Sequence, residues 1–384
     1  MQFSIGHSDA VDLRDAIDEA VRALAEWLCD EKPVAALVFS SPEYDNELFL
    51  KLLSEHYPGV PIAGCVAAGL MCSLGYAEDG ITVGLFHSAV GNFWIGSASG
   101  DGLSAGLEAT ISTVVDEALS AGPSTPPRLC FVFSAFVHDL AEVGRIVSEK
   151  VGPGCMVIGG GAGDHRVVLE DPARPAQFGA SRVTYDGVSI LVIGGEVMLS
   201  SSVGSGWRGV GTSAVVSKSS GNLVLELNGR PAREQLNAWN LKSGSLPIVA
   251  PVLARFDGNS QAMRPLFAVD EETGGALFGG EVPEGSELEP CAVLNAELLA
   301  TSGQVIERAL GGYSGIAPSG AFVVCCAARQ WSLGSRVARE HEVIEEALGG
   351  VPYLGFYSFG EIAPASNGAE YHSHSCAAVV FGAV

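Results

Sequence analysis

The chain has 384 residues, 47% of them hydrophobic and 17% charged, a composition typical of a globular protein with a large core. Its formal net charge is −23 and no cluster of Lys and Arg appears, which argues against binding to nucleic acid or to an anionic membrane surface. No apolar run approaches the roughly 18 residues that a membrane-spanning helix needs.

The N-terminal segment predicts an amphipathic helix over 12–28, because apolar side chains recur there at a helical spacing. The segment is acidic and lacks the basic and apolar regions of a secretory signal. The nine cysteines are an odd number without a regular spacing, which indicates free thiols in a reducing compartment. We therefore expect a cytoplasmic protein.

A pattern of strand, helix, strand with a Gly-rich elbow, and closing strand then occurs three times. The copies occupy residues 35–86, 128–195 and 321–382. Their elbows read VPIAGCVAAG (60–69), CMVIGGGAGD (155–164) and VPYLGFYSFGE (351–361). Recurrence of this kind indicates duplicated supersecondary units that bury a shared core.

The segments between the copies differ from one another. Residues 103–119 predict a helix, and GPSTPPR (122–128) is a Pro-rich connector. From about 195 to 295, short apolar runs alternate with turn signals, and one helix begins at Pro231 within them. Residues 294–310 predict a further helix before the third copy.

The predicted fold class is α/β in a mixed α+β form. Repeated βαββ units form layered sheets flanked by helices, with a β-rich insertion before the last unit. We expect two domains, 1–228 with the first two units and 229–384 with the β-rich segment and the third unit. An arrangement in which the third unit completes the N-terminal lobe fits the sequence equally well.

The three elbows follow equivalent strand ends, where open α/β sheets usually bind their ligands. Small side chains at such places either let a ligand approach the backbone or relieve crowding. We predict that the elbows converge on one concave pocket. The predicted ligand-binding residues are Ser40, Cys65, Ser134, Gly160, Asp164, Cys326, Arg329, Tyr357 and Glu361.

Arg329 and Glu361 carry opposite charges in the third copy. A guanidinium fork pairs with a carboxylate and a Glu pairs with an ammonium group, so the two would complement a zwitterion such as an amino acid. An internal Arg329–Glu361 salt bridge that pins the elbow is the alternative, and the sequence leaves both open.

Several strings resemble the FIST domain family over nearly the whole chain from about residue 33. SPEYD (41–45), PIAGCVAAG (61–69) and GYAEDGITV (75–83) resemble its N-terminal domain, and VPYLGFYSFGEIAP (351–364) resembles its C-terminal domain. The resemblance implies a bacterial sensory protein that binds a small polar metabolite, with amino acids as candidates. Because no kinase, cyclase or DNA-binding output segment is recognised, we expect it to act alone and to signal by contact with a separate partner, such as a histidine kinase or a cyclic-dinucleotide enzyme.

One subgroup of the family binds haem and senses nitric oxide, so haem is the alternative cofactor. That subgroup carries a Gln-His-Phe string where this chain has GSGWRGVG (204–211), which contains no His. The axial ligand would then be His165, His372 or His374. Each of the three also reads as a surface or turn histidine.

A cysteine-dependent hydrolase is the second alternative, with Cys65 or Cys326 as nucleophile and His372 or His374 as base. Buried single cysteines are more often small core residues, so we expect no catalytic residue. His372, His374 and Cys376 have a spacing that suits a metal, but no second cluster joins them and we expect no metal site. GGGAGD also lacks the Lys-Ser/Thr of a phosphate-binding loop.

Overall fold

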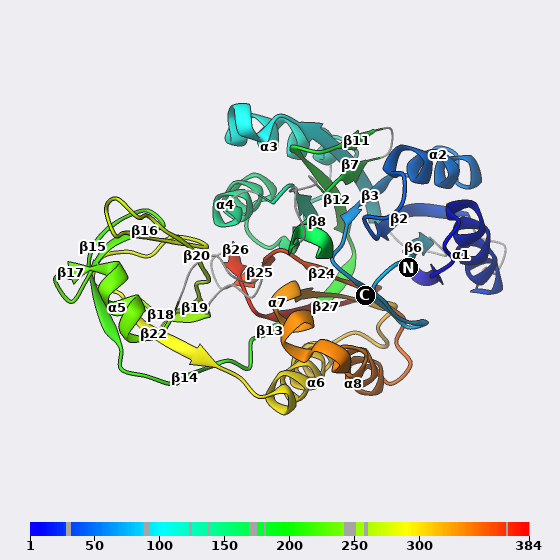
Figure 1. Cartoon of the computed structure of the whole chain (residues 1–384). Helices are drawn as coiled ribbons and strands as arrows, with labels where there is room; N and C mark the ends of the chain where they lie inside the picture. Colours follow the sequence, from blue (N-terminus) through cyan, green and yellow to red (C-terminus); the bar gives the residue numbers. More distant parts are fainter. Residues whose placement is uncertain are drawn as a thin grey trace.

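The computed structural model describes residues 1–27, 32–87, 93–122, 125–136, 139–168, 175–179, 182–241, 251–256, 260–365 and 368–383. Figure 1 shows a body of three sheets with their helices, and a smaller β-rich lobe beside it. Within the described part of the chain, no helix combines the length and the apolar character that a bilayer crossing requires.

The body consists of three units with one order of elements: strand, helix, strand, helix, strand, hairpin, strand. The first unit comprises β1 (Gln2–Ser8), α1 (Leu13–Trp27), β2 (Pro33–Ser40), α2 (Asn46–His56), β3 (Ile62–Val66), β4 (Leu70–Cys72), β5 (Gly75–Ala77) and β6 (Ile81–His87). The second comprises β7 (Phe93–Asp101), α3 (Leu103–Leu119), β8 (Pro127–Ser134), α4 (Leu140–Val151), β9 (Met156–Gly161), the 3₁₀ turn η1 (His165–Val168), β10 (Gln177–Gly179), β11 (Val183–Thr184) and β12 (Gly187–Gly195).

The third unit begins with one strand and continues only after the β-rich lobe. It comprises β13 (Val197–Gly204), α6 (Asn295–Gly312), β23 (Gly320–Cys326), α7 (Ala327–Leu333), η3 (Gly334–Arg336), α8 (Ala338–Leu348), β24 (Tyr353–Ser358), β25 (Glu361–Ala365), β26 (Gly368–His372) and β27 (Cys376–Ala383). The mixed α+β fold class with its repeated units is therefore confirmed. The repeat is longer than the sequence indicates, because a strand and a helix precede each predicted copy.

The three sheets repeat one strand order, β1-β6-β2-β3, β7-β12-β8-β9 and β13-β27-β23-β24. In each sheet the last two strands run parallel. Each unit then sends its hairpin to another unit's sheet. The β4–β5 hairpin pairs with β24, the β10–β11 hairpin with β3, and the β25–β26 hairpin with β9. The exchange closes a ring, so no unit completes its sheet by itself.

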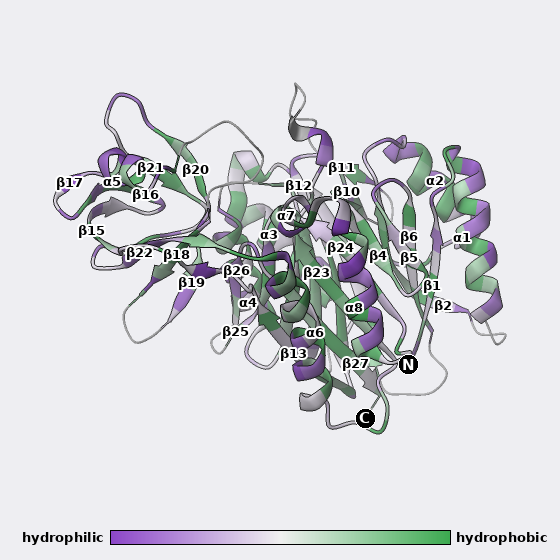
Figure 2. Cartoon of the chain, turned by 60° about the horizontal axis from the view of Figure 1, so that its bottom comes forward, coloured by the Kyte–Doolittle hydropathy of each residue, from purple (hydrophilic) through white to green (hydrophobic). Residues whose placement is uncertain are grey.

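The inner faces of the three sheets pack around a shared aromatic core. The ring of Phe39 stacks on Phe356 with 4.5 Å between centroids, and it meets Phe133 edge-on at 5.2 Å. These three rings come from three different units and are fully buried. Burying one such side chain stabilises the fold by about 1.5–3 kcal/mol. Figure 2 shows the helices covering the sheets from outside, with their hydrophilic residues turned outward.

The β-rich lobe interrupts the third unit between β13 and α6. It comprises β14 (Arg208–Gly209), β15 (Ala214–Ser220), β16 (Leu223–Leu227), β17 (Arg230–Pro231), α5 (Ala232–Ala238), β18 (Val252–Arg255), β19 (Gln261–Met263), β20 (Leu266–Val269), β21 (Ala276–Phe278) and β22 (Glu287–Ala292). These strands form one nine-stranded sheet over a separate small core.

The lobe begins later than the sequence pattern indicates. Residues 198–204 read as part of the β-rich segment, but they form β13, which pairs with β27 of the body over its whole length. The helix predicted at Pro231 is confirmed as α5, with Pro231 at its N-terminal cap. The predicted boundary at 228/229 falls in the turn between β16 and β17 and stays a prediction.

Candidate functional site

The three elbows meet in a ring of backbone hydrogen bonds. The amide of Ala68 donates to the carbonyl of Tyr357 at 3.0 Å, and the amide of Phe359 donates to that of Gly161 at 3.0 Å. The amide of Gly163 completes the ring by donating to the carbonyl of Val66 at 3.1 Å. Each elbow thus donates to another, and the strand ends converge as the repeat predicts. The concave pocket expected between them stays a prediction.

This ring defines which positions of the three units are equivalent. The ring acceptors Val66, Gly161 and Tyr357 correspond, so the residues that follow them also correspond, and these are Ala67, Ala162 and Ser358. The hairpins give a second set of equivalents, because Leu70, Gln177 and Glu361 pair with strand residues one position before those acceptors.

A third and a fourth set follow from one further backbone bond in each unit. The amides of Ser41, Ala135 and Cys326 donate to the carbonyls of Gly80, Gly187 and Ser375, respectively, at 2.8–2.9 Å. At all four sets of positions the third unit carries a polar or thiol side chain. We call these four residues, Cys326, Ser358, Glu361 and Ser375, the third-elbow cluster.

Glu361 is the centre of the third-elbow cluster and is fully buried. Its Oε1 accepts a hydrogen bond from Ser358 Oγ at 2.9 Å. Its Oε2 accepts from the backbone amide of Ser375 at 3.1 Å and from Ser375 Oγ at 2.5 Å. None of the described Lys, Arg and His residues forms an ion pair with it. The carboxyl is held by neutral donors alone, a costly arrangement for a buried charge.

Burial raises the pKa of Glu361 to about 7, against the hydrogen bonds from Ser375, Ser358 and the Cys326 thiol, which lower it. Burial and the neighbouring Glu361 also raise the pKa of the Cys326 thiol far above its ordinary value. The thiol is therefore a neutral donor to Glu361 rather than an activated nucleophile. A carboxyl that titrates near neutrality in a convergent polar cluster is a common mark of a functional site.

Gln177 shows what the same position does in the second unit. It is fully buried, and its Oε1 accepts from the amide of Gly187 at 3.2 Å, the equivalent of the Ser375 amide beside Glu361. Its Nε2 donates to the carbonyl of Pro175 at 2.6 Å. A neutral amide thus fastens the hairpin in the second unit, so the fold does not require a carboxyl at this position.

Arg329 lies outside the third-elbow cluster, and the pairing with Glu361 expected as one alternative is corrected. Its guanidinium is fully buried and binds Glu340 of α8, with Nε and Nη2 at 2.9 and 2.6 Å from Oε1. The same group donates to the carbonyls of Ser205 and Leu298. The reason is that Arg329 lies on α7 and turns toward α6 and α8, whereas Glu361 lies on β25, which pairs with β9 in the second unit's sheet.

Tyr357 joins that outer network. Its hydroxyl donates to Glu340 Oε2 at 2.6 Å, and burial raises the pKa of the phenol well above its ordinary value. Glu340 therefore accepts hydrogen bonds from Arg329, Tyr357 and Ser302, and this network links α6, α7, α8 and β24. The donors of this network are occupied by protein atoms, and the ligand-binding role expected of Arg329 and Tyr357 stays a prediction.

The structure brings Gly160 to the third-elbow cluster. It lies directly opposite Glu361 in the β9–β25 pairing, and a Cβ placed on it would come within 3.0 Å of Ser358 Cβ. Ser134 is buried at the end of β8, where its Oγ donates to the carbonyl of Ala135. Cys65 lies in the shared core, and Ser40 Oγ is buried without a hydrogen-bond partner among the described residues.

Asp164 and His165 belong to a separate group at the first and second elbows. Asp164 is paired with Arg166, with Oδ2 2.7 Å from Nη2. His165 Nε2 lies 3.4 Å from Glu43 Oε1 and 3.7 Å from Asp79 Oδ1. Burial and a hydrogen bond with Asp79 raise the pKa of Glu43. His, Glu and Asp could together ligate a metal ion here, but the group is acidic and half exposed, unlike a haem pocket.

His372 and His374 flank the third-elbow cluster. His372 lies opposite Glu361 in the β25–β26 pairing, and burial, aided by Arg264, lowers its pKa to about 4. His374 Nδ1 is 2.8 Å from Ser373 Oγ, and its ring packs edge-on against Trp207 with 5.0 Å between centroids. Of the three candidate haem ligands, His372 is a neutral imidazole whose buried Nε2 has no hydrogen-bond partner among the described residues.

Three important residues were not predicted. Ser358 and Ser375 hold Glu361, and Glu340 neutralises Arg329. The repeat itself could have revealed the serines, because Ala67, Ala162, Gly80 and Gly187 occupy the equivalent positions. Glu340 sits 11 residues after Arg329 across a break between helices, and no helical spacing signals that contact.

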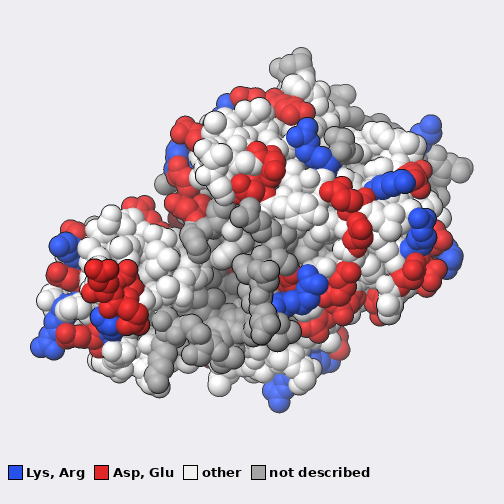
Figure 3. Space-filling view, turned by 45° about the horizontal axis from the view of Figure 1, so that its top comes forward, with Lys and Arg blue, Asp and Glu red and all other residues white. Residues whose placement is uncertain are grey.

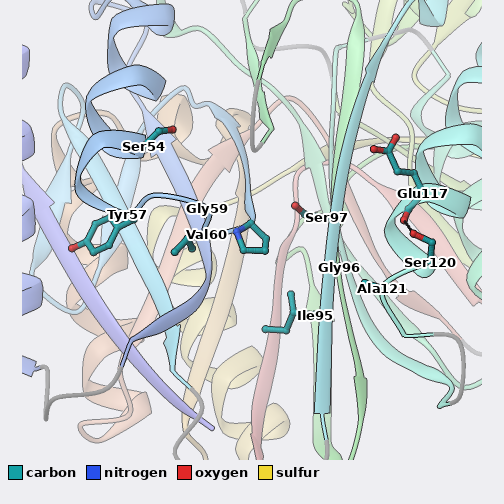
Figure 4. Close-up of a pocket in the computed structure, with 11 residues that line it drawn as sticks. Ser54, Tyr57, Gly59, Val60, Ile95, Gly96, Ser97, Glu117, Ser120 and Ala121 are labelled. Carbon is teal, nitrogen blue, oxygen red and sulfur yellow. Dashed lines mark hydrogen bonds between the residues drawn. The ribbon is translucent and has the colours of Figure 1, made fainter.

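A pocket of about 410 Å³ lies at the opposite end of the strands. It is formed where α2 leads into β3 and by β7 and α3 (Figure 4), and it is lined by Ser54, Tyr57, Gly59, Val60, Pro61, Ile95, Gly96, Ser97, Glu117, Ser120 and Ala121. No predicted site residue lines it. On the face shown in Figure 3, acidic side chains gather in several groups on the body and the lobe, in agreement with the charge of −23.

Two models of one protein family match most of the chain. Residues 34–230 match the model of the FIST N domain and residues 230–364 match that of the FIST C domain. An uncharacterized protein of Mycobacterium tuberculosis (strain CDC 1551 / Oshkosh) is 24% identical over 416 residues, covering 99% of this chain and 100% of that protein. An uncharacterized protein of Mycobacterium bovis is 26% identical over 197 residues, 47% of this chain and 49% of that protein.

A solved cyanuric acid hydrolase aligns over 100% of both chains, with 10% identity and a TM-score of 0.37. That score is too low to carry an argument.

Proposed function

Because the chain belongs to the FIST family, whose domains are sensory and bind small ligands, we propose that it is a sensor whose ligand contacts the third-elbow cluster. The observation that carries the proposal is Glu361, a fully buried carboxyl without a cationic partner among the described residues. An ammonium group of a small polar metabolite, such as an amino acid, would supply that partner.

The ligand would reach the cluster from the side of Cys326, Ser373 and Ser375. These residues keep 3–6% of their surface exposed, whereas Glu361 has none. A small opening of this side admits an ammonium group without disturbing the aromatic core. The proposed sensor acts alone in the cytoplasm and transmits its state by contact with a separate signalling protein, such as a histidine kinase or a cyclic-dinucleotide enzyme.

A thermal-shift screen against amino acids and small amines tests the proposal. A ligand at 100 times its Kd should stabilise the protein by about 2.7 kcal/mol. Glu361→Gln should remove the shift, because the side chain loses its charge. Its amide oxygen can still accept from Ser375, and its NH₂ can donate to Ser358 Oγ. Glu43→Gln, at a half-exposed carboxyl of the first unit outside the cluster, should leave the shift unchanged. A shift that survives in Glu361→Gln would contradict the assignment of the site.

Haem is a second candidate because of one observation, the neutral His372 imidazole with its unpartnered Nε2. A neutral imidazole is the form that ligates haem iron. When bound, haem would supply a site for a diatomic gas. Titration with haem should then give a Soret band that His372→Ala removes and His374→Ala keeps. A spectrum of free haem in the wild-type protein would exclude this function.

A further inference from the structure

Two ring nitrogens at the junction of lobe and body lack a hydrogen-bond partner, and the guanidinium of Arg264 at the same junction binds carbonyls but no carboxylate among the described residues. Trp207 Nε1 and His372 Nε2 are buried and have no hydrogen-bond partner among the described residues. Arg264 donates through Nε and Nη1 only to the carbonyls of Glu281 and Met263. Buried polar groups are almost always paired, so the two unpaired nitrogens call for a partner. His372 Nε2 donates to such a partner in the tautomer that carries the proton on Nε2.

The three residues come from three segments that meet at this junction. Trp207 follows β13 on the way into the lobe and packs against His374, two residues after His372. Arg264 connects β19 to β20 and lies 5.9 Å from the ring centroid of Tyr371, the neighbour of His372 on β26. Figure 1 shows β19 and β20 beside β26.

Arg264 is a largely buried cation whose neighbours are acidic. Burial lowers the pKa of Arg264, and Tyr371, Glu370, Glu281 and Asp139 oppose that effect. None of these carboxylates forms an ion pair with Arg264 among the described residues. Glu370 Oε2 lies 4.0 Å from His372 Nε2, but Glu370 is 63% exposed and free to turn toward solvent.

We propose that this junction binds an anionic oxygen group, a carboxylate or a phosphate, through Arg264, Trp207 and His372. The proposal rests on the proposed function in one respect, since the same ligand would place its anionic group here and its cationic group at Glu361. A guanidinium and an indole N–H are both suited to such oxygens. The lobe would then complete the binding site that the third elbow begins.

Calorimetric titration of the full-length protein with inorganic phosphate and, separately, with acetate tests the proposal. We expect saturable binding of one anion per chain, and the tighter probe distinguishes a phosphate ligand from a carboxylate. Arg264→Gln should weaken binding roughly tenfold to a hundredfold, because it removes a charged hydrogen bond. Arg255→Gln is the matched control, since Arg255 lies in the same lobe with its own partner Glu289.

Trp207→Phe is a second variant that is expected to fold, because it removes one N–H and keeps most of the ring. It should weaken anion binding several-fold, and phosphate or acetate should shift the ¹⁵N resonances of His372 in the wild-type protein only. Absence of saturable binding, or equal affinity in Arg264→Gln, Trp207→Phe and the wild type, would overturn the anion site. Anion binding that persists in Glu361→Gln while no amine binds would leave this site standing and remove the proposed function.

Discussion

The second and third units place different side chains at one equivalent position. Gln177 and Glu361 both begin an exchanged hairpin and are both fully buried. Each accepts a hydrogen bond from an equivalent backbone amide where the closing strand begins, that of Gly187 and that of Ser375, respectively. The amide needs no counter-charge, whereas the carboxyl does. A carboxyl maintained at a position where an amide suffices is a cost to stability, and such costs are typical of functional sites.

Two buried carboxyls of the third unit differ in the same way. Glu340 on α8 is matched by Arg329, Tyr357 and Ser302, whereas Glu361 on β25 is matched by neutral donors. A buried carboxylate with a cationic partner in the protein stabilises the fold. One with neutral donors alone can still take a cationic partner from a ligand. Four substitutions test this distinction.

The largest effect is expected at Glu340 and its partners. Arg329→Ala leaves the Glu340 carboxylate buried without its partner, and loss of one member of a buried pair costs about 3–5 kcal/mol. Urea unfolding at pH 7 measures it. Arg145→Ala is the control, because its partners Glu142 and Glu149 are exposed, and it should change the free energy by less than about 1 kcal/mol. Similar losses in the two variants would contradict a structural role for Arg329.

The second effect is a gain in stability. The pKa of Glu361 is raised from 4.5 to about 7, so between these values the folded chain holds a proton that the unfolded chain has lost. The contribution of Glu361 to the free energy of unfolding is therefore fully present below pH 4.5 and is lost as the pH rises to 7. Glu361→Gln removes this loss and should be more stable than the wild type by roughly 3 kcal/mol at pH 8, with little difference at pH 4. Unfolding curves that differ equally at both pH values would refute the buried titrating carboxyl.

The reverse substitution in the second unit, Gln177→Glu, should destabilise the protein. Gln177→Glu replaces the donor to Pro175 by an oxygen and introduces a charge, which costs about 1–3 kcal/mol at pH 8. The loss should shrink on acidification, because a protonated carboxyl donates again. A variant as stable as the wild type at pH 8 would show that the two positions are not equivalent.

The smallest effect is expected at Ser358, which stands where the other units have Ala67 and Ala162. Ser358→Ala removes one donor to Glu361 and should change stability by about 1 kcal/mol. The pKa of Glu361 should move further upward, because the lost bond favours the charged form. Infrared difference spectra of the carboxyl across pH 5–9 measure the pKa of Glu361. An unchanged or lowered pKa would contradict the assigned hydrogen bond.

The elements of the fold could be predicted from the sequence because local patterns encode them. The helix predicted over 103–119 is found at those residues as α3, and all three strand-helix-strand copies are present. The exchange of hairpins could not be predicted, since β4 and β24 pair across almost 300 residues and any exposed edge accepts a hairpin. The Arg329–Glu361 pair, one of the two alternatives, is wrong for a related reason, since the exchange places Glu361 in the second unit's sheet while Arg329 binds Glu340 of α8.

The exchanged hairpins have a consequence for fragments of the chain. A polypeptide limited to residues 34–230 would retain β4 and β5 but lose β24, to which they pair, and would leave β9 without β25. Open edges of this kind recruit other chains, so such a truncation should self-associate. The exchange of hairpins therefore also protects the full chain from aggregation, because each unit's hairpin covers the open sheet edge of another unit.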